Sequence, residues 1–129
     1  MRNKLKIVNT ESAPAAIGTY SQGILNNGLY YFSGQIGLAP ETMELESEFQ
    51  GQLDQTLENI KGLLKAEDLT TDNIIKTTIF LTDLSNFPKV NEAYEKFFSK
   101  PFPARSCVEV SALPKGALIE IEVIATQNV

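Results

Sequence analysis

The sequence predicts an α+β domain in which two helices cover one face of a mixed, six-stranded sheet. Short stretches of alternating apolar and polar residues occur in both halves of the chain, and this alternation is typical of strands. Two longer segments carry apolar residues at helical spacing. The resulting order, three strands, a helix, a strand, a helix and two strands, favours an α+β layer. With 129 residues, the chain is expected to form a single domain, 1–129.

The first third of the chain is expected to form an antiparallel meander. Residues 4–8 read as a short strand, which an irregular stretch containing Pro14 and Gly18 separates from an extended segment at 20–25. Asn26, Asn27 and Gly28 follow, and these residue types tolerate the positive φ of a hairpin turn. The next strand is expected at 29–33.

A helix and a central strand follow a surface loop at 38–47. The pattern from 48 to 66 predicts an amphipathic helix that covers the sheet. Residues 74–82 are rich in β-branched side chains and apolar on both faces, which is typical of a strand in the middle of a sheet. The apolar positions of the helix are Phe49, Leu53, Leu57, Ile60 and Leu64.

The second helix is expected to begin near Ser85, a plausible N-cap, with Pro88 in the first turn, where proline is tolerated. Asn91 falls close to the buried stripe of this helix. It either caps backbone groups or reaches a site. The stripe consists of Phe87, Val90, Tyr94 and either Phe97 or Phe98.

Two strands end the chain, at 103–110 and 118–125. In the first, Arg105, Cys107 and Glu109 share one face, because successive side chains of a strand point to opposite sides. In the second, Glu120 and Glu122 share a face. One interpretation is that both strands turn their charges to solvent; the other is that Arg105 belongs to a site.

Composition excludes several classes of function. The formal net charge is −5 and the basic residues are scattered, so nucleic acid is a poor candidate partner. The sequence has neither the apolar stretch of a signal peptide nor the roughly 18 apolar residues of a membrane span, so a soluble, cytoplasmic protein is expected. The single cysteine cannot form an internal disulfide. Without histidine, acid–base catalysis falls to carboxylates, tyrosine, cysteine, lysine or water.

Segments along nearly the whole chain resemble the RidA/YjgF family of reactive-intermediate deaminases, small trimeric enzymes that hydrolyse 2-imino and enamine acids. No one segment carries the likeness; their order and spacing do. They lie at residues 13–23, 33–37, 75–84, 103–110, 113–115 and 119–122, and at the single positions Phe87, Val90, Asn91, Tyr94, Phe97 and Phe98.

The resemblance implies the chorismate-mutase-like (RidA-like) fold, in which three subunits pack their sheets around a central barrel and leave a cleft at each interface. By default the last two strands would pair as a hairpin. The resemblance instead implies that the last strand lies inside the sheet. The segment 98–103 is a residue or two shorter than in many relatives, which affects the rim of the cleft more than its chemistry.

The resemblance also implies a reaction. Arg105 matches the catalytic arginine, whose guanidinium suits a planar carboxylate because it donates two parallel hydrogen bonds. Glu120 matches the catalytic glutamate, which would orient water, take a proton from it and return one to the departing ammonia. The substrates would be 2-imino or enamine acids such as 2-iminopropanoate and 2-iminobutanoate. The products would be 2-keto acids, with no metal or organic cofactor.

Further binding positions follow by the same match. Tyr20 would line the pocket, Ser33 and Gly34 would supply polar or backbone contacts, and Asn91 would support the cleft. Cys107 would lie beside the anchor as a binding residue, although a free cysteine in a strand is more often a packing residue. For Glu109 and Glu122 the expected roles are a solvated charge or an ion pair between subunits.

Two other functions remain as alternatives. The first is a ligand-binding or regulatory trimer that keeps the Arg105 anchor with little turnover. The second is a ribonuclease or translation inhibitor, activities sometimes attributed to the family. The acidic charge, the missing histidine and the lack of an aromatic and basic surface weigh against the second.

Overall fold

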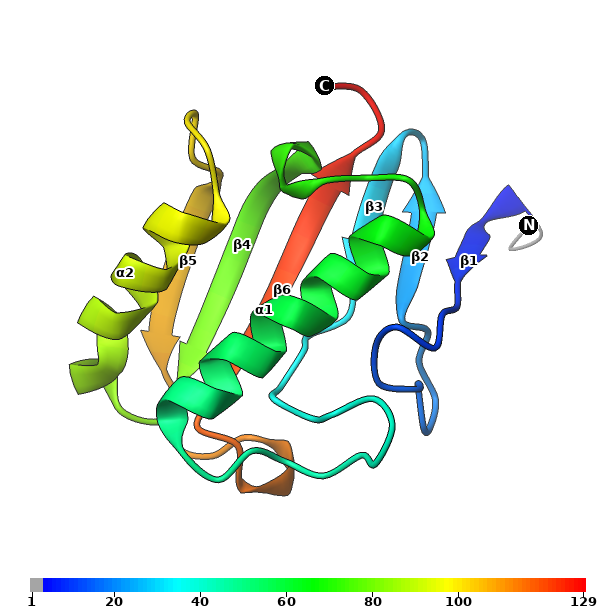
Figure 1. Ribbon diagram of the computed structural model, residues 1–129. Coiled ribbons are helices and arrows are strands. Elements are labelled where there is room, and N and C mark those ends of the chain that lie inside the picture. The colour runs from blue at the N-terminus through cyan, green and yellow to red at the C-terminus, as the bar shows by residue number, and fades with distance from the viewer. Residues whose placement is uncertain (1–3) are drawn as a thin grey trace.

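The computed structural model describes residues 4–129 and contains a six-stranded sheet with two α-helices (Figure 1). Three short 3-10 helices, η2 to η4, connect some of these elements. The α-helices are α1 (Phe49–Ala66) and α2 (Phe87–Phe97). The strands are β1 (Lys6–Val8), β2 (Gly23–Asn26), β3 (Leu29–Phe32), β4 (Ile74–Leu81), β5 (Ala104–Glu109) and β6 (Ile119–Thr126).

The strands are arranged in the order β1-β2-β3-β6-β4-β5. All neighbours are antiparallel except β4 and β5, which run parallel, so the sheet is mixed as expected. The default hairpin between the last two strands does not form, because β4 lies between β5 and β6. The implied position of the last strand inside the sheet is therefore confirmed.

Both α-helices lie on the same face of the sheet, and the core lies between them and the strands (Figure 1). Leu53, Ile60 and Leu64 of α1 are buried together with Ile79 of β4 and Ile121 of β6. Burying one such side chain contributes about 1.5–3 kcal/mol. The helical spacing seen in the sequence thus marks the face of α1 that holds the sheet.

The opposite face of β4, β5 and β6 carries a different set of side chains. Glu120 pairs with Phe80, and Phe80 pairs with Val108, so these three point to the side away from the helices. Val108 is 44% exposed. No helix of residues 4–129 covers this surface, which we call the open face.

Buried amides hold the loops at one end of the sheet. The Gln22 side chain accepts a hydrogen bond from the Thr10 backbone N–H (2.7 Å) and donates one to the Pro14 carbonyl (2.8 Å). Asn59 of α1 donates to the Leu38 carbonyl (2.9 Å). These bonds fix the segments before β2 and after β3, although their backbones form no long strands.

Two local expectations were wrong. Ser85 does not cap α2. It lies within η3 (Leu84–Asn86), where its backbone N–H donates a hydrogen bond to the Asp83 carboxylate at 2.9 Å. The α-helix then begins at Phe87, with Pro88 in its first turn as expected. The first strand begins at Lys6 rather than at residue 4, because only Lys6–Val8 pairs with β2.

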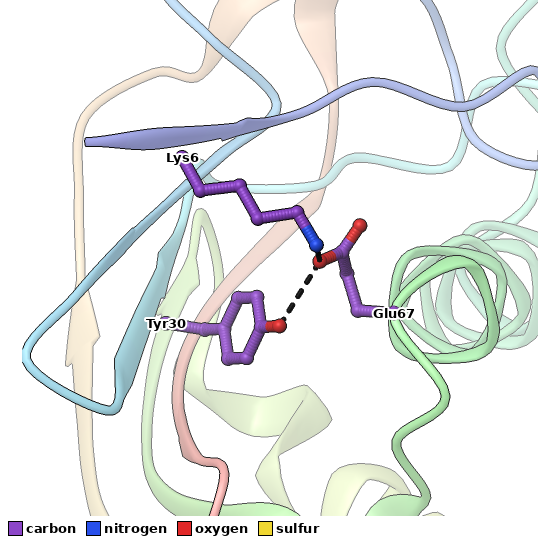
Figure 2. Close-up of polar contacts among 3 residues, drawn as sticks. All are labelled: Lys6, Tyr30 and Glu67. Atoms are coloured by element: carbon purple, nitrogen blue, oxygen red, sulfur yellow. Dashed lines mark hydrogen bonds and ion pairs between the residues drawn. The ribbon is translucent and has the colours of Figure 1, made fainter. Parts of the chain in front are cut away.

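A polar cluster joins the edge strand β1 to the end of α1. Figure 2 shows Glu67, the residue after α1, between Lys6 and Tyr30. The Tyr30 hydroxyl donates to Glu67 Oε1 at 3.0 Å, and Lys6 Nζ lies 2.7 Å from the same oxygen. The Glu67 side chain is only 9% exposed, so its carboxylate is a largely buried hydrogen-bond acceptor for the buried Tyr30.

Within residues 4–129, neither helix has the length and apolar character needed to cross a membrane.

Candidate active site

Arg105 lies on the helix-facing side of β5 and reaches α2. Its guanidinium donates a hydrogen bond to Asn91 Oδ1 (2.5 Å). Its Cζ lies 4.9 Å from the centre of the Phe87 ring and 5.7 Å from that of Tyr94. A cavity of about 490 Å³ opens beside it, lined by Asn91, Tyr94, Glu95, Phe102, Pro103 and Arg105.

The charge of Arg105 has no acidic partner within residues 4–129. Glu95 lines the same cavity, but no carboxylate of the described chain lies within ion-pair distance of the guanidinium. One amide oxygen and two aromatic rings leave most of the guanidinium N–H donors without a partner among residues 4–129. Such a fork can bind a carboxylate through two parallel hydrogen bonds.

A second, larger cavity of about 600 Å³ contains the other half of the predicted site. Tyr20, 54% exposed, lies at this cavity together with Ser33, Gly34 and Glu120. The Ser33 hydroxyl donates to the Ser21 carbonyl at 2.6 Å, so its oxygen remains as an acceptor toward the cavity. The remaining lining residues are Pro14, Ala15, Ile17, Gln22, Gln35, Ile36, Leu38, Met43, Pro114, Lys115 and Glu122.

Gly34 and Glu120 touch each other in this cavity. A Cβ atom at Gly34 would lie only 2.1 Å from Glu120 Oε2 and 2.8 Å from its Cδ. Because glycine has no Cβ, the carboxyl group fits against the backbone there. Burial, and secondly the charge of Glu122, raises the pKa of the Glu120 carboxyl above its usual range. Glu120 therefore keeps its proton to a higher pH than an exposed glutamate, as suits a general acid or base.

The two cavities are on opposite sides of the sheet. Arg105 pairs with Thr77, which is buried on the helix side, whereas Glu120 pairs with Phe80 on the open face. Since side chains of a strand cannot cross to the other face, Arg105 and Glu120 of one chain cannot contact the same small substrate. Each chain therefore presents two separate halves of the predicted site.

Cys107 and Glu109 follow Arg105 on the same side of β5. Cys107 is half-buried, packs against the core and lines neither cavity. Burial raises the pKa of its thiol, and Arg105 partly opposes that effect. Glu109 accepts a hydrogen bond from the Leu84 N–H at 3.0 Å and so holds the turn that precedes α2. Neither role expected for Glu109 included this local bond.

Three residues were not assigned from the sequence to the surroundings of Arg105 and Glu120. Phe87 and Tyr94 were assigned to the core stripe of α2, but their rings also lie against the Arg105 guanidinium. The signal was present in the spacing, because Phe87, Asn91 and Tyr94 recur at i, i+4 and i+7 on one helix face. Glu122 was expected as a solvated charge or in an ion pair between subunits; it is exposed and also lines the cavity of Glu120.

Comparisons with known proteins identify the family of the chain. The family model described as Endoribonuclease L-PSP matches residues 10–127. The chain is 46% identical over 126 residues to the 2-iminobutanoate/2-iminopropanoate deaminase of Escherichia coli K12, covering 95% of this chain and 98% of that protein. It is 50% identical over 124 residues to the chloroplastic Reactive Intermediate Deaminase A of Arabidopsis thaliana. That match covers 95% of this chain but only 66% of the plant protein.

Solved structures show the same fold. Crystalline RidA from an Antarctic Psychrobacter species superimposes with a TM-score of 0.91 at 45% identity, covering 94% of this chain and 98% of that one. Escherichia coli TdcF with bound serine gives a TM-score of 0.88 at 44% identity, with coverages of 94% and 98%. The chain therefore belongs to the endoribonuclease L-PSP family, the RidA/YjgF family of reactive-intermediate deaminases.

Proposed function

We propose that this protein hydrolyses 2-imino and enamine acids, such as 2-iminopropanoate and 2-iminobutanoate, to 2-keto acids and ammonia. Arg105 binds the substrate carboxylate, and Glu120 of a neighbouring copy orients and activates the water. The functional unit is a homotrimer with one site at each subunit interface. The deaminase names of the relatives support the reaction class.

The observation that carries this proposal is the state of Arg105. Its guanidinium is held by Asn91 and two aromatic rings, while no carboxylate of residues 4–129 neutralises it. A cation held in this way beside a cavity suits an anionic ligand with a planar end. Serine, the ligand in the TdcF structure, is an α-amino acid and carries such a carboxylate.

Once the carboxylate is anchored, the adjacent C=N carbon is fixed in place for attack by water. Glu120 takes a proton from the attacking water as the C–O bond forms and gives it to the imine nitrogen, which yields a carbinolamine. It then transfers the hydroxyl proton to the same nitrogen, so that the C–N bond breaks and the 2-keto acid and ammonia are released. A positioned acid or base contributes about 10²- to 10⁴-fold to such a step, and fixing the reactants adds to it. The raised pKa of Glu120 brings its titration closer to neutral pH, where both proton transfers are needed.

The trimer is proposed because one chain cannot bring its own Arg105 and Glu120 together. The open face of β4–β6, which carries Glu120, is also the surface without a helix to cover it. If the open faces of three copies surround a common axis, the cavity of Glu120 lies at the edge of each interface. Arg105 of the next copy can then complete it, and Cys107 beside Arg105 can line the joint cleft.

The test is the release of 2-keto acid from imino acids generated in situ by an amino-acid oxidase or a threonine dehydratase. Wild type should accelerate hydrolysis over the spontaneous rate, and Arg105→Ala and Glu120→Ala should both lose the acceleration. Mixing the two inactive variants under subunit exchange should restore part of the activity, because one interface then contains both intact residues. Full activity in either single variant contradicts the assigned roles.

The alternative of a ligand-binding trimer is distinguished by the same experiment. If wild type binds 2-keto acids but does not accelerate hydrolysis, the protein is a sensor rather than an enzyme. The family description also names an endoribonuclease, but with a net charge of −5 the chain is poorly suited to a polyanion. Single-stranded RNA serves as the negative control substrate.

A further inference from the structure

We propose that Phe87 is a positioning residue for the carboxylate anchor, whose ring fixes the plane of the Arg105 guanidinium. Its role is distinct from packing, although Phe87 also contacts the core. The inference rests on the proposed function, since it concerns how Arg105 binds the substrate carboxylate.

Arg105 has two kinds of neighbour, a hydrogen-bond acceptor and two aromatic rings. Asn91 takes one hydrogen bond from the guanidinium, and Phe87 and Tyr94 lie within cation–π distance, at 4.9 and 5.7 Å from Cζ. A ring stacked on the face of a guanidinium consumes none of the N–H donors, because these lie in the plane of the group. The ring can therefore hold the cation without competing with a carboxylate ligand.

A single hydrogen bond would not be sufficient to orient this group. Arginine has several rotatable bonds, and one bond to Asn91 leaves the guanidinium able to turn about that contact. Two parallel hydrogen bonds to a substrate carboxylate require a defined plane. Contact with a ring removes the remaining rotation before the ligand arrives, which lowers the entropic cost of binding.

Phe87 is the ring whose replacement disturbs the core less. Tyr94 is buried, and its hydroxyl donates to Thr77 at 3.1 Å, so its replacement disturbs the interior as well. Phe87 is half-buried at the first residue of α2. The same helix offers a matched control in Phe97, which is also half-buried. The centre of its ring lies 5.6 Å from Lys61 Nζ, and neither Phe97 nor Lys61 lines the Arg105 cavity.

The experiment compares Phe87→Leu, Phe87→Met and Phe87→Tyr with Phe97→Leu. Leu and Met keep an apolar side chain but remove the ring, whereas Tyr keeps the ring. Each variant is assayed for KM and kcat with 2-iminobutanoate, and for the Kd of 2-ketobutanoate and of its neutral amide. Using the carboxylate and its amide separates positioning of the cation from a general change in the shape of the cavity.

We expect Phe87→Leu and Phe87→Met to raise KM and the Kd of 2-ketobutanoate by about 2- to 30-fold, the range of a cation–π contact. The Kd of the amide and kcat should change less than twofold. Phe87→Tyr should restore carboxylate binding, and Phe97→Leu should bind like wild type. The proposal is overturned if both ring deletions bind the carboxylate like wild type, or if they weaken the carboxylate and the amide equally.

Arg105→Ala distinguishes failure of this inference from failure of the proposed function. If Arg105→Ala loses carboxylate binding while the Phe87 variants do not, only the role of the ring is refuted. If Arg105→Ala still binds 2-ketobutanoate and turns over the imine, the anchor itself is wrong and the proposed function fails with it.

Discussion

Replacing Gly34 with alanine should misplace Glu120 while leaving the fold almost unchanged. The added Cβ would lie 2.1 Å from Glu120 Oε2, whereas ordinary contacts begin near 3.4 Å, so the carboxyl group must move by more than 1 Å. The backbone of Gly34 does not need a positive φ, and alanine can adopt its conformation. The clash is with a flexible side chain, so the change in stability should be small.

The expected effect on catalysis is large by comparison. Displacing a catalytic group by about 1 Å can cost on the order of 10²-fold in rate. We expect kcat/KM for 2-iminobutanoate to fall by about that factor in Gly34→Ala, measured as keto-acid release over the spontaneous rate. Binding of 2-ketobutanoate should change less than kcat/KM, because the carboxylate is anchored by Arg105, whose contacts with Asn91, Phe87 and Tyr94 do not involve Gly34.

Gly51→Ala is the matched control. A Cβ at Gly51 would also approach a glutamate, with Glu46 Oε1 at 3.1 Å, but in α1 and away from both cavities. It should keep full activity and gain up to about 1 kcal/mol of stability from its position in a helix. If Gly34→Ala retained half or more of the wild-type kcat/KM while its melting temperature stayed within a few degrees, the close approach would not be what places Glu120.

Other predictions concern stability. Glu120→Gln should have a higher melting temperature than wild type at pH 8 and the same melting temperature at pH 4. The pKa of Glu120 is raised in the folded state, so ionising this carboxyl destabilises the fold; the destabilisation grows as pH rises through that pKa and disappears where the carboxyl is protonated in both the folded and the unfolded state. Equal differences in melting temperature at both pH values would contradict this. Burial raises the pKa of Tyr94 to about 12, so it remains a donor to Thr77; Tyr94→Phe should lose about 1–3 kcal/mol in urea unfolding yet keep its KM, because the ring remains. Glu67→Ala leaves the buried Tyr30 hydroxyl without its acceptor and should also lose about 1–3 kcal/mol with unchanged kcat/KM; unchanged stability would show that water replaces it.

The elements of the fold were predictable because their signals are local. The helical spacing of Leu53 and Leu57 defined α1, and the β-branched run after Ile74 defined β4. The adjacent residues Asn27 and Gly28 indicated the hairpin turn, and both have positive φ in the structure. The start of α2 was not predictable, because Ser85 is an acceptable cap by residue type but lies inside η3, which Asp83 caps, and Asn86, the residue before α2, makes no side-chain cap bond.

The candidate functional residues were predicted from the sequence by resemblance, but their arrangement was not. Alternation along a strand states which residues share a face within that strand. It does not state which face of β5 lies on the same side of the sheet as a given face of β6. That relation depends on β4, which separates the two strands and puts Arg105 and Glu120 on opposite sides.

The sequence by itself therefore determined the elements, the family and the chemical types at the site, because these depend on neighbours along the chain and on the identity of side chains. Only the tertiary structure decided that Phe87 and Tyr94 flank the Arg105 cation, that Gly34 makes room for Glu120, and that the two halves of the site lie on different faces. Such relations join residues that are distant in sequence, and they follow from strand order, register and packing, which no local pattern records.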